Sequence, residues 1–168
     1  MDAFPNPPRY TTRDLPPYSY VPGQNPHPIS DSAGHSHGHP PDKAVPIDDA
    51  NWRTNDTWLW AIDLFNHGYY WESHEVWEGL WHAAGRRGPT ADFLKGLIKL
   101  AAAGVKFREG RLEGVKLHAA RAAELLEPSR GRVVFGIAVD RLLSEAHRLS
   151  EVDIGEWQAF QIGLHIPS

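Results

Sequence analysis

The residues best suited to chemistry lie in one short stretch, residues 70–82, where aromatic and ionisable side chains are interleaved. On an α-helix, His74 and Glu78 are one turn apart on the same side, with Cβ atoms about 5–6 Å from each other. An imidazole and a carboxylate at that spacing can share one proton or bind one divalent cation. A cation with open coordination positions can support hydrolysis, so the stretch predicts either a metal site or a proton-sharing pair.

A metal site needs more than two ligands, because a catalytic zinc ion usually takes three from the protein. His82 extends the spacing of His74 and Glu78 by a further four residues and is the preferred third ligand. The other candidates are Glu75, His118 and His147. The sequence contains no cysteine, so His, Asp and Glu are the strong ligands available, and zinc, manganese or iron is the expected ion.

The same residues also fit a structural role. His74 and Glu78 would then hydrogen-bond each other or a neighbouring helix, as buried polar groups do, and the tryptophans would belong to the core. Spacing alone favours this interpretation over the metal site. The zinc-protease pattern does not decide the matter, because Glu78 stands where that pattern needs a second histidine.

Helices must position these side chains, and helix signals follow one another along the chain. Apolar residues at helical spacing fill residues 58–65, and Asn55 or Asp56 can cap this first helix. A second helix, residues 69–84, ends at Gly85. The candidate ligands therefore project from the second helix.

Three more helices complete the prediction. The third starts at the cap Thr90 and ends at Gly110, the fourth covers residues 112–126 before Pro128, and the fifth covers residues 139–149. Short connectors imply antiparallel neighbours. The expected fold is all-α, an antiparallel bundle of about five helices.

Three segments lie outside these helices. Residues 131–136 and the chain from Ile154 onward fit a docked extension or a short strand pair, and we expect them to cap the bundle. Eleven of the 14 prolines fall before Ile47, among Gly, Ser and His and without apolar periodicity. This composition predicts a disordered tail over residues 1–47, ahead of a helical domain over residues 48–168.

The charge balance and the missing motifs exclude several functions. Lys and Arg number 17 against 21 Asp and Glu, a formal charge of -4, so we expect no nucleic-acid partner. The sequence has neither a phosphate-binding glycine loop nor a Gly-x-Ser-x-Gly turn. No apolar run is long enough to span a membrane, which predicts a soluble, cytoplasmic protein.

The motif around the candidate ligands also carries a family resemblance. The signature of a His, three residues, a Glu, two residues and a Trp is reproduced by His74, Glu78 and Trp81. The motif residues that share the resemblance are Phe65-Asn66, Tyr70, Glu72, His74-Glu75, Glu78, Leu80-Trp81, Phe93-Leu94, Gly96-Leu97-Ile98 and Leu100-Ala101-Ala102. From about residue 65 to residue 126 the chain resembles the domain-of-unknown-function 309 family. The resemblance implies a small all-helical bacterial or archaeal protein whose His and Glu bind metal, with the label of metal-dependent hydrolase.

The chain departs from the family pattern at two lysines. Lys95 and Lys99 stand where glutamine is common in the family, beside the apolar face of the third helix. They either pair with Glu78 as a structural ion pair or orient an anionic substrate.

Two functions follow from the sequence. In the first, the protein is a divalent-metal-binding domain and a metal-dependent hydrolase, acting on a small-molecule or anionic ligand. Its metal ligands are His74, Glu78 and His82, its catalytic residues are Glu78 and Lys99, and its cofactor-binding residues are Trp81 and Lys95. In the second, the protein is a non-catalytic helical module that binds a protein or a small anion.

Overall fold

The computed structural model describes residues 6–153 and 160–164. Within these ranges the chain forms five α-helices: α1 (Asp56–Asn66), α2 (Tyr70–Ala83), α3 (Pro89–Arg108), α4 (Leu112–Leu126) and α5 (Val139–Ser150). A 3-10 turn, Glu127–Ser129, follows α4. The strands β1 (Val133–Val134) and β2 (Ile137–Ala138) form an antiparallel hairpin, with Val133 opposite Ala138. The predicted all-α bundle of five helices is confirmed.

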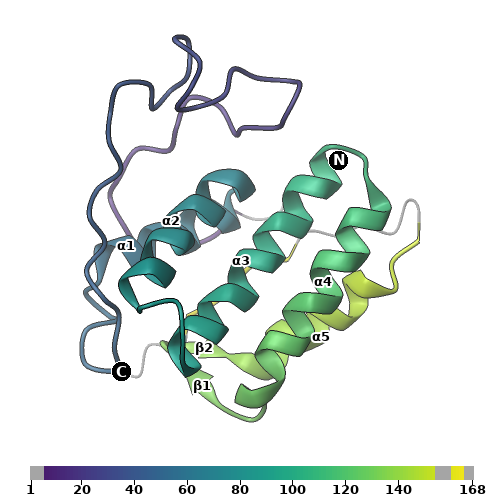
Figure 1. Cartoon of the computed structure of the whole chain (residues 1–168). Coiled ribbons are helices and arrows are strands. Elements are labelled where there is room, and N and C mark those ends of the chain that lie inside the picture. The colour runs from purple at the N-terminus through teal and green to yellow at the C-terminus, as the bar shows by residue number, and fades with distance from the viewer. Residues whose placement is uncertain (1–5, 154–159, 165–168) are drawn as a thin grey trace.

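Successive helices pack against one another, α1 on α2, α2 on α3, α3 on α4 and α4 on α5 (Figure 1). The short connectors make this arrangement possible, because each allows the chain to reverse direction within a few residues. The small hairpin lies at the end of the bundle where α4 gives way to α5 (Figure 1). The sequence of residues 131–136 fits either a docked extension or a short strand pair, and this hairpin is the strand pair.

Most helix ends follow the sequence signals. The Asn55 side chain caps α1 by accepting a hydrogen bond from the Trp58 backbone N–H at 3.0 Å, and Gly85 follows α2 with a φ of 81°. The start of α3 differs from the prediction, because its cap is Gly88 rather than Thr90. Pro89 occupies the first helical position, where its fixed φ fits the helix and no backbone donor is needed.

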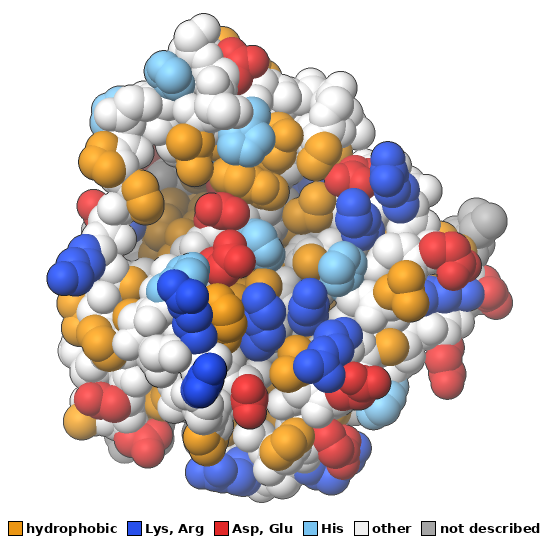
Figure 2. Space-filling view, in the orientation of Figure 1, with side chains coloured by type: hydrophobic (Ala, Val, Ile, Leu, Met, Phe, Trp, Pro, Cys, Tyr) orange, Lys and Arg blue, Asp and Glu red, His pale blue; other side chains and the backbone are white. Residues whose placement is uncertain are grey.

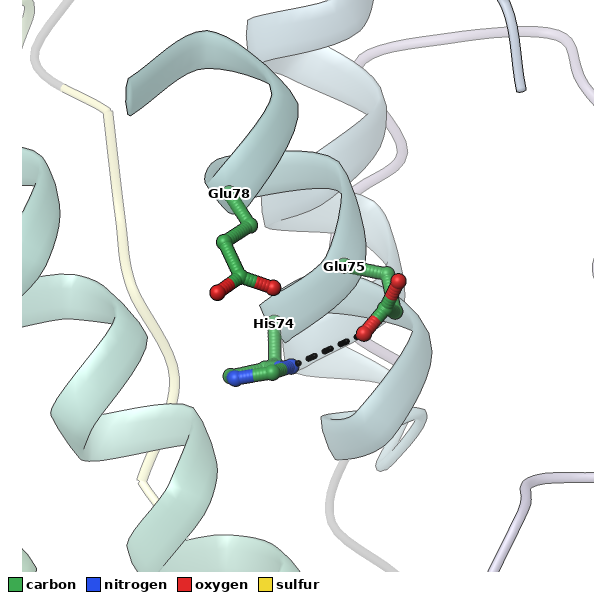
Figure 3. Close-up of side chains that lie close together, drawn as sticks. All are labelled: His74, Glu75 and Glu78. Atoms are coloured by element: carbon green, nitrogen blue, oxygen red, sulfur yellow. Dashed lines mark ion pairs between the residues drawn. The ribbon is translucent and has the colours of Figure 1, made fainter. Parts of the chain in front are cut away.

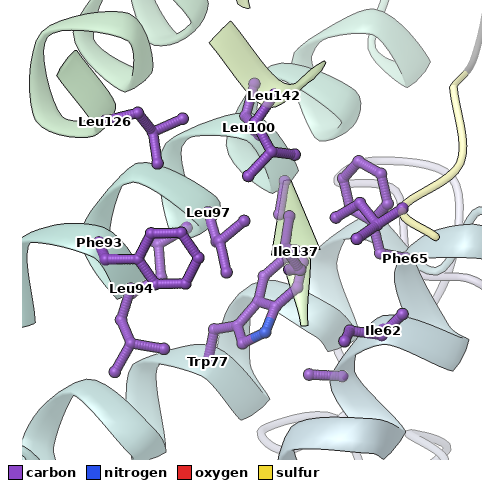
Figure 4. Close-up of a cluster of buried hydrophobic side chains, with 14 of the residues drawn as sticks. Ile62, Phe65, Trp77, Phe93, Leu94, Leu97, Leu100, Leu126, Ile137 and Leu142 are labelled. Carbon is purple, nitrogen blue, oxygen red and sulfur yellow. The ribbon is translucent and has the colours of Figure 1, made fainter. Parts of the chain in front are cut away.

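The core lies between the five helices and the hairpin (Figure 4). Large side chains that are almost completely buried include Trp58, Trp77, Phe93, Leu97 and Leu126. Trp77 points inward from α2 (Figure 4), so this helix is anchored in the core. The helix that carries the candidate ligands is therefore held rigidly.

The composition predicts a disordered tail over residues 1–47, of which the structure describes residues 6–47. This N-terminal segment, residues 6–47, contains no helix or strand, in agreement with its many prolines, but it lies along α1 and α2 (Figure 1). Val21 and Ile47 are 4% and 6% exposed. The segment is thus irregular and packed against the bundle.

Two buried carboxylates explain this packing. Asp63 of α1, fully buried, accepts hydrogen bonds from the backbone N–H groups of Tyr10 and Thr11 at 2.8 and 2.9 Å. Glu72 of α2 accepts one from the Tyr20 N–H at 2.8 Å. Hydropathy patterns do not reveal such contacts, because the donors are backbone groups of a segment without regular structure.

The C-terminal residues 160–164 dock on the bundle through α1. Ile162 is buried, and its backbone N–H and C=O both bond the side chain of Asn66, at 2.7 and 2.9 Å. This is the docked extension among the two forms predicted. Trp157 and Ile166, which the same prediction included, lie outside the described residues. In the described part of the chain, none of the helices combines the length and apolarity that crossing a membrane requires.

Candidate functional site

The ionisable face of α2 brings three ligand-type residues together, His74, Glu75 and Glu78 (Figure 3). One ligand atom from each lies within 4.8 Å of the other two. The i, i+4 spacing of His74 and Glu78 places them on one side of the helix, and Glu75 joins them because it follows His74 directly and its side chain bends back toward the imidazole (Figure 3). The site is therefore local to α2.

The His74 ring has one nitrogen in an unusual environment. Its Nδ1 lies 3.5 Å from Glu75 Oε1, and this buried nitrogen has no hydrogen-bond partner within the described part of the chain. The His74 and Glu75 side chains are 26% and 40% exposed, so the pair sits at the edge of the bundle. A buried polar atom without a partner calls for an explanation, and a bound ion is one.

The predicted third ligand, His82, does not belong to this group. It is exposed, and its Nδ1 accepts a hydrogen bond from the Arg86 Nε–H at 3.0 Å. Its ring meets the Trp81 ring edge to face, at 5.1 Å between centroids. Glu75, one of the alternatives, occupies the third place instead. The remaining alternatives, His118 on α4 and His147 on α5, also fall outside the group.

The two lysines of α3 lie beside this face without pairing with it. Lys95 Nζ stands 4.3 Å from the centre of the Trp81 ring, a cation–π contact. Burial lowers the pKa of Lys99, Lys95 and Arg121 lower it further, and Glu78 raises it. Within residues 6–153 and 160–164, neither lysine forms an ion pair with Glu78, so the carboxylate keeps its capacity to bind another cation.

His118 of α4 lies near Lys99 and Lys106 of α3. Burial lowers the pKa of its imidazole, and positive charge on Lys99 and Lys106, together with His74, lowers it further. The fold therefore favours a neutral ring at this position.

A cleft of about 540 Å³ opens on the other side of the ligand group, between α1, α2 and the N-terminal segment. Glu75, Glu78 and His82 line it on one side. Its apolar wall is made by Trp60, Leu64, Trp71 and Val76 from the helices and Pro16, Pro40 and Pro41 from the segment. Figure 2 shows acidic side chains in red beside a hollow with hydrophobic walls, under the N-terminal segment.

The cleft also contains residues that the sequence patterns did not assign to a site. Glu72 lines it, and so does His35, whose Nε2 lies 3.1 Å from Glu72 Oε1. Both side chains are almost fully buried, at 5% exposed for His35 and 6% for Glu72. Glu72 is a member of the family motif, whereas His35 has the sequence context of a low-complexity tail. Nothing in their spacing of 37 residues signals the contact.

One part of the chain matches a known protein family. Residues 58–117 match the model of the family described as Domain of unknown function (DUF309). This part of the chain is similar to the DUF309 family. The match confirms the resemblance and contains α2 and α3 complete, hence the whole ligand group. No curated protein matches the chain. The N-terminal segment that walls the cleft lies outside the DUF309 match.

Proposed function

We propose that this protein binds one divalent cation through His74, Glu75 and Glu78. The observation that carries the proposal is the convergence of one imidazole and two carboxylates within 4.8 Å on a rigid helix. Two carboxylates balance the charge of a divalent ion, and a mixed nitrogen and oxygen donor set suits zinc, manganese or iron. The proposal keeps two predicted ligands and replaces His82 with Glu75.

The residues fit such an ion. Ligand atoms about 2.1 Å from one tetrahedral centre lie about 3.4 Å apart. Side-chain rotations that bring the atoms, now within 4.8 Å of one another, closer by about 1.4 Å complete the set. His74 Nδ1, which lacks a hydrogen-bond partner among the described residues, would gain one bond to the ion. No lysine ion pair has to be broken at Glu78.

We further propose that the domain is hydrolytic. A divalent cation supplies Lewis acidity, which polarises a carbonyl or phosphoryl oxygen. The cleft beside Glu75 and Glu78 has the size of a small-molecule site and apolar walls that exclude water. Lys99, on α3, can attract an anionic group of a substrate.

Metal content tests the binding proposal. The full chain, untagged and purified without added metal, should carry or take up about one ion per molecule from zinc, manganese or iron, measured by mass spectrometry. His74→Ala and Glu78→Gln should abolish binding while the helical circular dichroism is unchanged. A matched control, His37→Gln with His39→Gln, removes two tail histidines that do not belong to the ligand group and should leave the ion in place.

The outcome against the proposal is equally clear. An ion content that survives His74→Ala and Glu78→Gln, or a chain that takes up none of the three metals, would refute it. Metal at about 100 times its Kd should stabilise the fold by about 2.7 kcal/mol, a rise in Tm of roughly 5–10 °C for a chain of this size. The metal-loaded protein is then screened against phosphoesters, esters and amides.

A metal-free anion-binding module is the second candidate. The observation that favours it is the crowding of Lys95, Lys99 and Arg121, which with burial lowers the pKa of Lys99. A bound anion would relieve that repulsion. The two candidates are distinguished by chelation, because a chelator should lower the Tm of the metal protein and leave that of the anion-binding module unchanged.

A further inference from the structure

We propose that the cleft between the N-terminal segment and α1–α2 binds a small organic cation, a protonated amine carried on an apolar body. Glu72, at the foot of the cleft, is the residue that would receive the ammonium group. This site lies outside the metal group, since neither Glu72 nor His35 belongs to that group. The inference does not rest on the proposed metal site: it concerns the metal-free chain, in which Glu75 and Glu78 also face the cleft.

The uncompensated charge of the cleft is negative. Three glutamates of α2, Glu72, Glu75 and Glu78, line it. The single arginine in its lining, Arg13, is already engaged with two aspartates, Asp42 at 3.9 Å and Asp56. Low-dielectric walls focus such a field and favour a cationic ligand over an anionic one.

Glu72 supplies an acceptor that the protein leaves unused. Its Oε1 receives the Tyr20 N–H and the His35 ring, but its Oε2, although buried, has no hydrogen-bond partner among the residues the structure describes. A carboxylate oxygen hidden from water without a donor is costly. An ammonium group that enters from the cleft and shifts this side chain slightly would provide the missing donor, in a charge-assisted bond.

The walls fit the apolar body of the ligand. Trp60, Leu64 and Val76 offer aromatic and aliphatic surface, and the cleft volume of about 540 Å³ falls in the range of small-molecule sites. Trp60 already attracts cations within the protein, because the guanidinium carbons of Arg9 and Arg13 each lie 5.7 Å from its ring centre. Aromatic faces stabilise ammonium groups by the same quadrupole attraction.

Three probes of one shape test the inference: 4-phenylbutylamine, 4-phenylbutanol and 4-phenylbutanoate. Binding to the full chain is measured by isothermal titration calorimetry in the presence of a chelator, with tryptophan fluorescence as a second signal. The amine should bind at least tenfold more tightly than the alcohol, and the carboxylate should bind more weakly still. Equal affinity for the three probes, or no binding of the amine, would overturn the proposal.

Variants locate the bound amine. Glu72→Gln keeps an oxygen for the Tyr20 N–H and should weaken amine binding at least tenfold, while the affinity of the alcohol changes less than twofold. Gly79→Leu fills the cleft from α2, where an added Cβ meets only Ala44 at 3.9 Å, and should abolish binding of both probes. Amine binding that is unchanged in either folded variant refutes the site.

One further variant separates this inference from the proposed function. His74 belongs to the ligand group but does not line the cleft. His74→Ala should therefore lose the metal and keep the amine. If neither the parent chain nor any variant binds metal and the amine still binds through Glu72, only the metal proposal is wrong. If folded His74→Ala protein loses the amine, the cleft is not a separate site and this inference is contradicted.

Discussion

Removing the Asp63 carboxylate should detach the start of the N-terminal segment and destabilise the fold. Asp63 is fully buried in α1 and accepts four hydrogen bonds, from Arg9 Nε at 3.1 Å, from the Tyr10 N–H at 2.8 Å, and from the Thr11 N–H and hydroxyl at 2.9 and 2.7 Å. Asp63→Ala leaves all four donors without an acceptor. The expected result is a less stable chain whose first described residues no longer pack on α1.

The size of the loss follows from these contacts. Hydrogen bonds to a charged group contribute roughly 1.5–3 kcal/mol each, but the released donors recover water when the segment detaches, so the sum of four overstates the effect. Breaking a buried ion pair by removing one partner costs about 3–5 kcal/mol. We expect about 3 kcal/mol, the lower end of that range, because the Arg9 side chain is 32% exposed and stays hydrated.

Two assays measure this change. Urea unfolding followed by circular dichroism gives the free energy of unfolding, and limited trypsin digestion reports detachment through faster cleavage after Arg13. Asp92→Asn, an exposed carboxylate in the first turn of α3, is the matched control and should cost no more than about 0.5 kcal/mol. A loss below about 1 kcal/mol for Asp63→Ala, with no faster cleavage, would refute the assigned role of Asp63.

Two further predictions concern α3. Gly104→Ala should destabilise the fold by about 3 kcal/mol, because the added Cβ would collide with the buried Tyr70 ring. Gly96→Ala should cost about 1 kcal/mol, because its added Cβ meets the more pliable Leu126 side chain at 2.8 Å. Equal Tm values for the two variants would contradict this. Burial lowers the pKa of Lys99 in the folded protein, so this group's contribution to stability is complete above its unfolded pKa and falls as the pH drops through the folded pKa. Unfolding measured between about pH 7 and pH 10.5 should show this rise with pH, and Lys99→Gln should remove its share of it.

The sequence by itself determined the bundle and the placement of His74 and Glu78 on one side of a helix. Helical spacing of apolar residues and glycines after the helices, such as Gly85 and Gly110, are local signals, and a helix needs only contacts within a few residues to be recognised. The spacing of His74 and Glu78 is local in the same way. Two of the three residues of the candidate metal site, His74 and Glu78, therefore followed from four residues of separation on one helix.

Tertiary structure formed the cleft, and side-chain conformation decided which third residue lies beside His74 and Glu78. His82 had the better helical spacing, but its position at the exposed end of α2 gives it Arg86 as a partner, while Glu75 bends toward His74. Side-chain rotamers of this kind depend on neighbours that a helical wheel does not contain.

The N-terminal segment was decided entirely by distant contacts. Tyr20 and His35 meet Glu72 across 52 and 37 residues, through a backbone donor and a histidine in a stretch that has no periodicity. Composition alone indicated that such a chain lacks the apolar surface to order itself. The buried carboxylates Asp63 and Glu72 provide the acceptors that hold the segment. Their partners lie 37 to 54 residues away along the chain, which is why the cleft could not be predicted from the sequence.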